Sequence, residues 1–313
     1  MNTNKIIFTA ILAIGVYATI VLLSDTHLLY QKFATMHIYS ILIALGLFST
    51  GYFIRSFRWI SMLRFMKINI PIGRNMMIYY TGYAFSLTPG KVGEAMRSKY
   101  LKDDFGVALE KSVPTIFTER YYDVMGVVVI ALLTFGLSKS QSFFIFVSMG
   151  LLVLVYFAVK KKIIIRLLSP LKSSARLCKI SSKIVMVSEN LDSLLKPKIF
   201  LVCFVLTIVS WVIESTGAYF VFNAFDIQTT IPSAIFDYVL SALVGASSFL
   251  PGGIGGTEGS LIGLLLSEGH NYNQALGPVL MIRIFALWYV ILIGLFFTFV
   301  YKLKYTKAET RVK

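Results

Sequence analysis

Side chains that bind metals or form disulfides are scarce in this chain of 313 residues, which has two cysteines and three histidines. Cys178 lies in a basic segment and Cys203 in an apolar run, so their positions do not suggest a disulfide between them. No two histidines stand at a metal-ligand spacing. We therefore expect neither a metal site nor another cofactor.

Charged residues are also scarce, at 14% of the chain against the roughly 25% of a soluble domain. Hydrophobic residues make up 57%, and the mean hydropathy is +0.75. This composition is typical of a protein that lies in lipid. The net charge of +15 could indicate nucleic-acid binding, but the basic residues flank apolar runs and form no basic domain. We expect a membrane protein that binds no nucleic acid.

Long apolar runs, by contrast, are abundant, and a helix needs about 20 such residues to span a bilayer. A signal peptide is the alternative for the first run, but no small-residue cleavage site follows it. Two further stretches, 74–102 and 231–268, are each interrupted by Pro-Gly, and we interpret them as re-entrant hairpins. The predicted spanning helices are the six runs 6–23, 38–54, 108–137, 141–159, 199–225 and 273–301.

The two interruptions share the pattern Pro-Gly-x-(Val/Ile)-Gly, followed by a glutamate. Non-helical backbone at membrane depth is tolerated only when it is buried in protein or lines a wet cavity, and the helix that follows could bind an anion at its N-terminus. Close packing of small residues is the alternative, and it stays open for the later glycines of the second break. The predicted hairpin breaks are Pro89, Gly90 and Gly93, and Pro251, Gly252, Gly253 and Gly255.

The distribution of basic residues predicts the topology, because cytoplasmic loops collect Lys and Arg. With the N-terminus inside, only Lys32 and Lys139 of the 30 basic residues fall outside. The 160–198 segment holds ten of the others and reads as a basic amphipathic connector on the cytosolic surface. We therefore expect both termini in the cytoplasm and, as the location, the bacterial inner membrane.

Corresponding residues recur at a nearly constant offset in two halves of the chain. Pro89 and Pro251 are 162 positions apart, and Arg120 and Arg283 are 163 apart. Because the two hairpins open on opposite faces in this topology, the halves form an inverted repeat, the architecture of many secondary transporters. We expect one all-α polytopic transmembrane domain over 1–313, about six spanning helices plus two broken hairpins. The repeats are 38–137 and 199–301, with 160–198 between them.

Ionisable residues inside the predicted spans mark a substrate site, since charge at the bilayer centre is costly. Arg120 and Asp123 stand at i, i+3 and can pair, whereas Arg283 needs a partner from elsewhere, with Glu258, Glu94 and Glu214 as candidates. Ion pairs that only hold the bundle together are the alternative. The candidate substrate-binding residues are Arg58, Glu94, Arg97, Glu119, Arg120, Asp123, Glu258 and Arg283.

Some of these residues have a competing interpretation. Arg58 is expected to extend to the membrane interface rather than to bind substrate, and both roles stay open for Arg97. Glu214, inside an apolar run, is a candidate proton or counter-charge site. No catalytic motif is recognisable, so we expect a transporter and not an enzyme. An intramembrane transferase and a non-transporting partner of a surface-polymer synthase remain alternatives.

Five motifs follow one another along the chain: "RSFRW" at 55–59, "TPGKVGEAMR" at 88–97, "ERYYD" at 119–123, "LPGGIGGTEG" at 250–259 and Arg283. In their order and spacing they resemble the flippase-like family typified by the transmembrane region of lysylphosphatidylglycerol synthase. The resemblance covers roughly residues 10–300 and implies an inverted-repeat fold and movement of a lipid across the membrane. The implied partner is an anionic or zwitterionic phospholipid or a polyprenyl-phosphate lipid, with a homo-oligomer left open. We expect no counterpart of the synthase's soluble aminoacyltransferase domain, and the resemblance then argues against aminoacylation by this protein.

Overall fold

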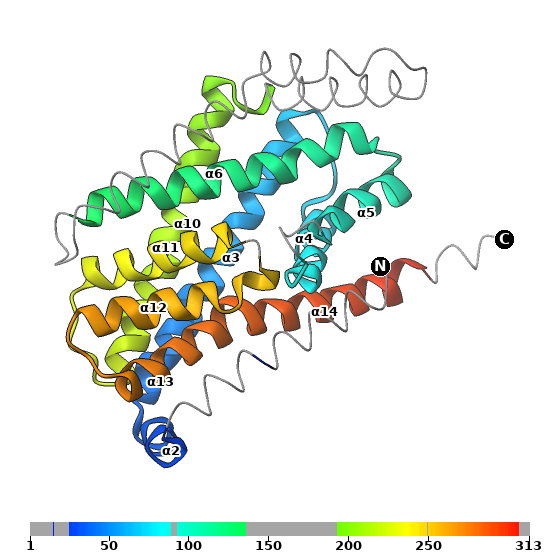
Figure 1. Cartoon of the computed structure of the whole chain (residues 1–313). Helices are drawn as coiled ribbons and strands as arrows, with labels where there is room; N and C mark the ends of the chain where they lie inside the picture. The colour runs from blue at the N-terminus through cyan, green and yellow to red at the C-terminus, as the bar shows by residue number, and fades with distance from the viewer. Residues whose placement is uncertain (1–14, 16–24, 89–92, 136–192, 249, 307–313) are drawn as a thin grey trace, which may run out of the picture.

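The computed structural model describes residues 15, 25–88, 93–135, 193–248 and 250–306, and every regular element within them is helical (Figure 1). The short helix α2 (Thr26–Thr35) is capped at its N-terminus by Asp25. The Asp25 carboxylate accepts hydrogen bonds from the backbone N–H groups of His27 and Leu28, which would otherwise have no partner in the first turn. No residue of α2 is fully buried, and Leu29 and Phe33 pack against the edge of the core.

Two long helices, α3 (Ile38–Phe65) and α10 (Pro197–Ala224), pack against each other through the middle of the molecule (Figure 1). Their approach depends on small residues. A Cβ on Gly51 would lie 3.1 Å from the Ser210 carbonyl oxygen, and one on Gly217 would lie 2.9 Å from the Phe48 ring. Glycines at a crossing let helix backbones come close, which is how helices gain packing energy in lipid.

The first hairpin consists of α4 (Ile72–Thr81), the 3-10 turn η1 (Gly82–Phe85) and α5 (Met96–Phe105). Pro89 and Gly90 of the predicted break lie outside the described residues. Gly93 lies within them, and its N–H donates to the Thr88 hydroxyl at 2.7 Å. The long helix α6 (Leu109–Phe135) follows the hairpin.

The second hairpin consists of α11 (Ile231–Ser247), the 3-10 turn η4 (Pro251–Gly253) and α12 (Gly256–Ser267). The predicted helix break is present. Gly252, Gly253 and Gly255 have φ angles of 61°, 67° and 88°, a region that residues with a Cβ rarely adopt. The chain then continues as α13 (Tyr272–Arg283), the π-helical turn η5 (Ile284–Trp288), α14 (Tyr289–Tyr301) and a second π-helical turn, η6 (Lys302–Thr306).

Within the described residues, three helices are long and apolar enough to cross a membrane: Ile38–Phe65, Pro197–Ala224 and Tyr272–Tyr305. The predicted all-α fold of a membrane protein is therefore confirmed. The apolar runs 6–23 and 141–159 and most of the connector 160–198 lie outside the described residues. The number of six spanning helices and the inverted repeat stay predictions.

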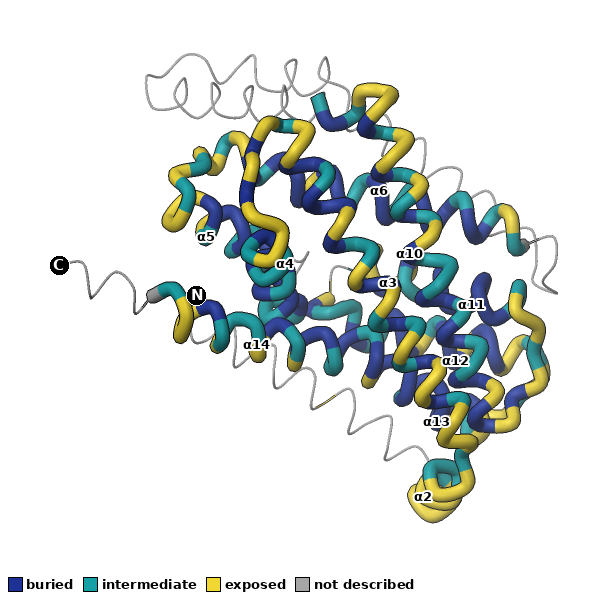
Figure 2. Tube along the Cα trace, turned by 180° about the vertical axis from the view of Figure 1, so that it is seen from behind, coloured by how far each residue is buried: buried dark blue, intermediate teal, exposed yellow. Residues whose placement is uncertain are grey.

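Burial follows the contacts between the long helices and the second hairpin (Figure 2). The core cluster runs from Phe48 and Trp59 on α3 to Phe222 on α10, Phe236 on α11 and Leu265 on α12. The outer face of α14 remains exposed and apolar, with Leu292 at 65% and Phe299 at 63% relative exposure. Such a face suits contact with lipid tails.

Candidate functional site

Three arginines and three carboxylates form a buried ionic network where α3, α5 and α6 meet. At its centre, Arg97 Nη2 donates to Glu94 Oε2 at 2.9 Å and to Glu119 Oε2 at 2.6 Å. The Arg97 guanidinium also lies over the rings of Trp59, at 4.4 Å, and Tyr79, at 5.0 Å. Ion pairs and aromatic rings thus enclose this cation. The members of the network are Arg58, Glu94, Arg97, Glu119, Arg120 and Asp123.

Arg58 closes one side of the network and is fully buried. Its Nη1 donates to Asp123 Oδ1 at 2.7 Å and to the Thr207 hydroxyl at 2.8 Å. The Trp211 indole N–H reaches the same Asp123 oxygen at 3.2 Å. The expectation that Arg58 extends to the membrane interface is therefore wrong, because two more helices supply partners within the protein.

Arg120 differs from the other two arginines because 33% of its side chain is exposed. Its Nη2 lies 3.4 Å from Glu94 Oε2, and its Nη1 lies 3.3 Å from Asp123 Oδ2. The second contact is the i, i+3 pair that the sequence spacing predicts. Both contacts are longer than the 2.6 to 2.9 Å bonds that hold Arg97. Arg120 is thus the accessible and more loosely held cation of this network.

The network balances three positive against three negative formal charges, as burial demands, since an unpaired buried ion is strongly destabilising. Chemically, it can exchange one anion for another. A phosphate approaching Arg120 could replace a carboxylate oxygen, because guanidinium forks bind both groups in the same geometry. Arg58 and Arg97 would then retain the carboxylates.

A second, smaller ionic group lies at the break of the second hairpin. Arg283 Nε donates to Glu258 Oε1 at 2.8 Å, and its Nη2 donates to the Gly252 carbonyl oxygen at 2.8 Å. The other Glu258 oxygen accepts the Gly255 N–H at 2.8 Å. Of the three partners considered for Arg283, Glu258 is thus the one it contacts. The N-terminus of α12, predicted as an anion site, already has the chain's own carboxylate as its anion.

The two groups resemble each other in their parts. In each, an arginine of the helix after the hairpin contacts a glutamate of that hairpin: Arg120 with Glu94, and Arg283 with Glu258. They differ in their partners. Arg97 and Arg120 contact the same carboxylate, that of Glu94, and so belong to one site. Arg283 instead donates to the Gly252 carbonyl oxygen at the break of its own hairpin.

A third ionic group includes a residue that the sequence analysis did not select. Arg55 pairs with Glu214, and the Tyr238 hydroxyl donates to the same carboxylate. The Arg55 guanidinium lies 4.4 Å from the Trp211 ring. Arg55 stands three residues before Arg58, so both face the same side of α3. That i, i+3 spacing was the available signal for Arg55.

Asp237 on α11 was also missed, since it is a single acid in an apolar stretch. It is 1% exposed, its Oδ2 has no hydrogen-bond partner among the described residues, and none of the ion pairs there includes it.

We expect Asp237→Asn to raise the free energy of unfolding by about 1 kcal/mol, because an amide loses less hydration on burial than a carboxylate. Unfolding in mixed detergent micelles measures the change. Asp123→Asn is the matched control and should lower stability, since Asp123 has cationic partners. A loss in the Asp237 variant as large as in the control would contradict the prediction.

The chain is similar in sequence to known membrane proteins. The model of the family described as "Lysylphosphatidylglycerol synthase TM region" matches residues 10–294. A UPF0104 membrane protein of Methanothermobacter thermautotrophicus is 37% identical over 100 residues, which is 32% of this chain and 30% of that protein.

Two longer matches are UPF0104 membrane proteins MJ1078 of Methanocaldococcus jannaschii and PH1989 of Pyrococcus horikoshii. The first is 23% identical over 67% of this chain and 90% of the relative. The second is 25% identical over 81% of this chain and 84% of the relative. These names give neither a substrate nor a location in the bacterial inner membrane. Because the family model covers most of the sequence, the chain is a membrane protein that belongs to the family of the lysylphosphatidylglycerol synthase transmembrane region.

Proposed function

We propose that this protein is a flippase, which moves an amphipathic lipid with a phosphate-bearing headgroup, or a lipid-linked precursor, from one leaflet to the other. The observation that carries the proposal is the state of Arg120. It is the partly exposed arginine in a network whose other two arginines are buried and hold their carboxylates at 2.6 to 2.9 Å.

A phosphate at Arg120 would take over the contacts that Glu94 and Asp123 now make at 3.4 and 3.3 Å. Each displaced carboxylate keeps another partner, Arg97 for Glu94 and Arg58 for Asp123. Phosphate binding therefore leaves both Glu94 and Asp123 with a cationic partner. An arginine fork also suits phosphate better than a lysine would, because it is planar and always charged.

Two interrupted hairpins support alternating access to such a site. Discontinuous helices near the midplane are a common feature of transporters with inverted repeats. In this proposal the two halves move relative to each other while the lipid tails stay in the bilayer. The Arg120–Glu94 and Arg283–Glu258 contacts would break and re-form as each hairpin opens.

The test is leaflet exchange in liposomes that contain the purified chain and fluorescent phospholipid or polyprenyl-phosphate analogues, followed by dithionite quenching. We expect Arg120→Gln to lower the exchange rate roughly tenfold or more, since charge-assisted bonds to the headgroup are lost. Arg64→Gln is the matched control, because Arg64 is exposed at the end of the same helix as Arg58 and belongs to no ion pair of the described residues.

Exchange that falls in the Arg120 variant and persists in the Arg64 variant supports the proposal. Equal exchange rates in both variants would show that the headgroup does not bind at Arg120. If folded protein exchanges no analogue, and a lipid-linked product forms in detergent where transport is impossible, the chain is a transferase and the proposal is wrong.

A further inference from the structure

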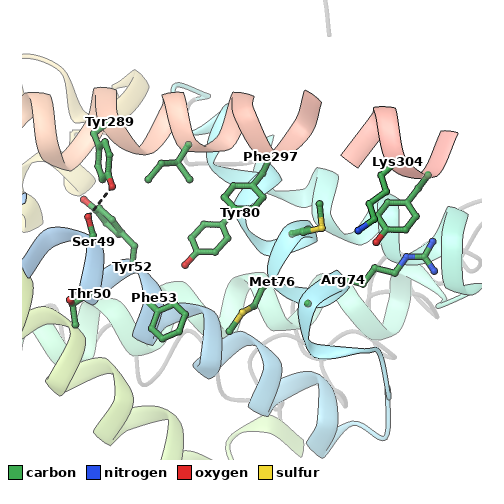
Figure 3. A pocket seen from close by; sticks show the side chains of 14 residues that line it. Ser49, Thr50, Tyr52, Phe53, Arg74, Met76, Tyr80, Tyr289, Phe297 and Lys304 are labelled. Atoms are coloured by element: carbon green, nitrogen blue, oxygen red, sulfur yellow. Dashed lines mark hydrogen bonds between the residues drawn. The ribbon is translucent and has the colours of Figure 1, made fainter. Parts of the chain in front are cut away.

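A groove of about 920 Å³ lies between α3, α4 and α14, lined by residues outside the ionic network (Figure 3). Its middle is apolar. Tyr80 and Phe297 stack there with ring centroids 5.0 Å apart and an interplanar angle of 21°. Met76 and Phe53 lie on the same stretch (Figure 3). Flexible methionines and aromatic rings suit a mobile hydrocarbon chain, because thioether side chains adapt to irregular shapes.

The two ends of the groove differ in character. Arg74 and Lys304 stand at one end (Figure 3). At the other end the Ser49 hydroxyl lies 2.9 Å from the Tyr289 hydroxyl, with Tyr52 beside them. The centroid of the Tyr52 ring lies 5.6 Å from the Arg55 guanidinium carbon. The groove thus has a cationic end and an end of neutral hydroxyl groups close to the Arg55–Glu214 pair.

The cationic end has positive charge available for a ligand. The Arg74 guanidinium stacks on Tyr305 at 4.1 Å and on Phe105 at 4.8 Å, which fixes its position. Its Nε is buried and has no hydrogen-bond partner among the described residues. Lys304 is exposed, and no Asp or Glu of the described part of the chain lines the groove. Two cations without a lining carboxylate are complementary to an anionic group.

The length of the groove also fits a lipid. Tyr289 and Lys304 lie about 22 Å apart along the helix at about 1.5 Å per residue. One leaflet of the hydrocarbon core is about 15 Å thick, half of the usual 30 Å. A ligand with its anionic group at Lys304 could therefore extend an acyl chain beyond the middle of the bilayer. The basic end is where the positive-inside rule places the cytoplasmic surface.

We propose that this groove binds one acyl chain of an anionic phospholipid from the cytoplasmic leaflet, with its phosphate held by Arg74 and Lys304. The lipid lies along α14, and its chain end approaches Tyr52. The inference rests on the proposed function only in taking a lipid as the ligand class. It assigns a site separate from Arg120, where a lipid can be held before or without transfer.

Native mass spectrometry of delipidated full-length protein with phosphatidylglycerol or phosphatidylcholine tests the phosphate end. We expect Lys304→Gln to weaken phosphatidylglycerol binding severalfold and Arg74→Gln with Lys304→Gln to weaken it roughly tenfold or more, through lost charge-assisted bonds. Lys302→Gln is the matched control, since Lys302 is exposed near the same helix end and does not line the groove. Equal binding by wild type and the double variant would overturn the inference.

A second pair of variants tests the acyl chain. Ile293→Trp fills the groove and should displace the lipid, whereas Leu292→Trp, on the exposed face of α14, should not. If the two tryptophan variants retain lipid equally, the lipid sits elsewhere. Competition by inorganic phosphate as strong as by phosphatidylglycerol would show an anion site without an acyl chain and would also overturn the inference.

A third comparison separates this inference from the proposed function. Arg120→Gln should keep the phosphatidylglycerol binding that the Lys304 and Ile293 variants lose, even where leaflet exchange is lost, because Arg120 does not line the groove. If folded protein binds phosphatidylglycerol in the groove but exchanges no lipid, the groove is supported as a lipid site and the flippase proposal is wrong. If exchange persists and the Lys304 and Ile293 variants bind lipid like wild type, the groove assignment fails alone.

Discussion

Replacing Arg97 by Met is expected to lower the free energy of unfolding by about 3–5 kcal/mol, the usual loss when one member of a buried ion pair is removed. Arg97 holds Glu94 and Glu119 with its shortest bonds, 2.9 and 2.6 Å. Glu119 is fully buried and would keep only a 3.8 Å contact to Arg58 among its described ion pairs. Equilibrium unfolding in mixed detergent micelles gives the value.

Arg120→Met is the matched comparison and should lower stability by only about 1 kcal/mol, because the Arg120 side chain is one-third exposed. Both carboxylates that Arg120 contacts retain a buried arginine after the change. The two substitutions therefore separate structure from function: one removes folding energy, and the other removes transport. Equal stability losses would show that Arg120 is as much a structural cation as Arg97.

A double-mutant cycle tests the source of the Arg97 effect. If the loss comes from the orphaned acid, Arg97→Met combined with Glu119→Gln should be more stable than Arg97→Met alone, since the neutral amide needs no cation. If the combined variant is less stable than either single one, packing of Arg97 on Trp59 and Tyr79 contributes more to stability than its ion pairs do.

The sequence predicts the helices, the second break and the candidate charges because these depend on local features. Apolar runs give spanning helices, and a Pro-Gly cluster with several glycines cannot continue a helix. The predicted pair between Arg120 and Asp123 depends only on helix periodicity. The Pro-Gly pattern likewise places Glu258 next to a non-helical stretch, where its bond to the Gly255 N–H is formed.

The ion-pair partners from distant helices and the groove depend on tertiary contacts that local sequence patterns do not encode. Arg58 reads as an interfacial residue because it stands near the end of an apolar run, but Thr207 and Asp123 come from helices far along the chain. Asp237 stands alone in an apolar stretch, and the partner of Arg55, Glu214, comes from a helix far along the chain. The groove between α3, α4 and α14 is likewise assembled from three distant segments, and only the fold brings Arg74 and Lys304 to one end.

Gly294→Ala is expected to lower stability by about 3 kcal/mol, the upper end for overpacking, because the new methyl group would meet backbone and not a movable side chain. A Cβ on Gly294 would lie 2.1 Å from Ala84 N and 2.6 Å from the Tyr83 carbonyl carbon. At this point α14 rests directly on η1 of the first hairpin, and either element has to move to accept a methyl group. Unfolding in mixed micelles measures the loss.

Gly263→Ala on α12 is the matched control, because a Cβ there meets nothing within 4 Å. That change should raise stability by about 0.5–1 kcal/mol through the higher helix propensity of alanine. If the two variants are equally stable, the close contact of α14 with the first hairpin does not exist in the membrane. If only the Gly294 variant is destabilised, α14 and the first hairpin form one packed unit. Because Tyr80 and Phe297 of the groove belong to that unit, its lipid affinity should fall with its stability.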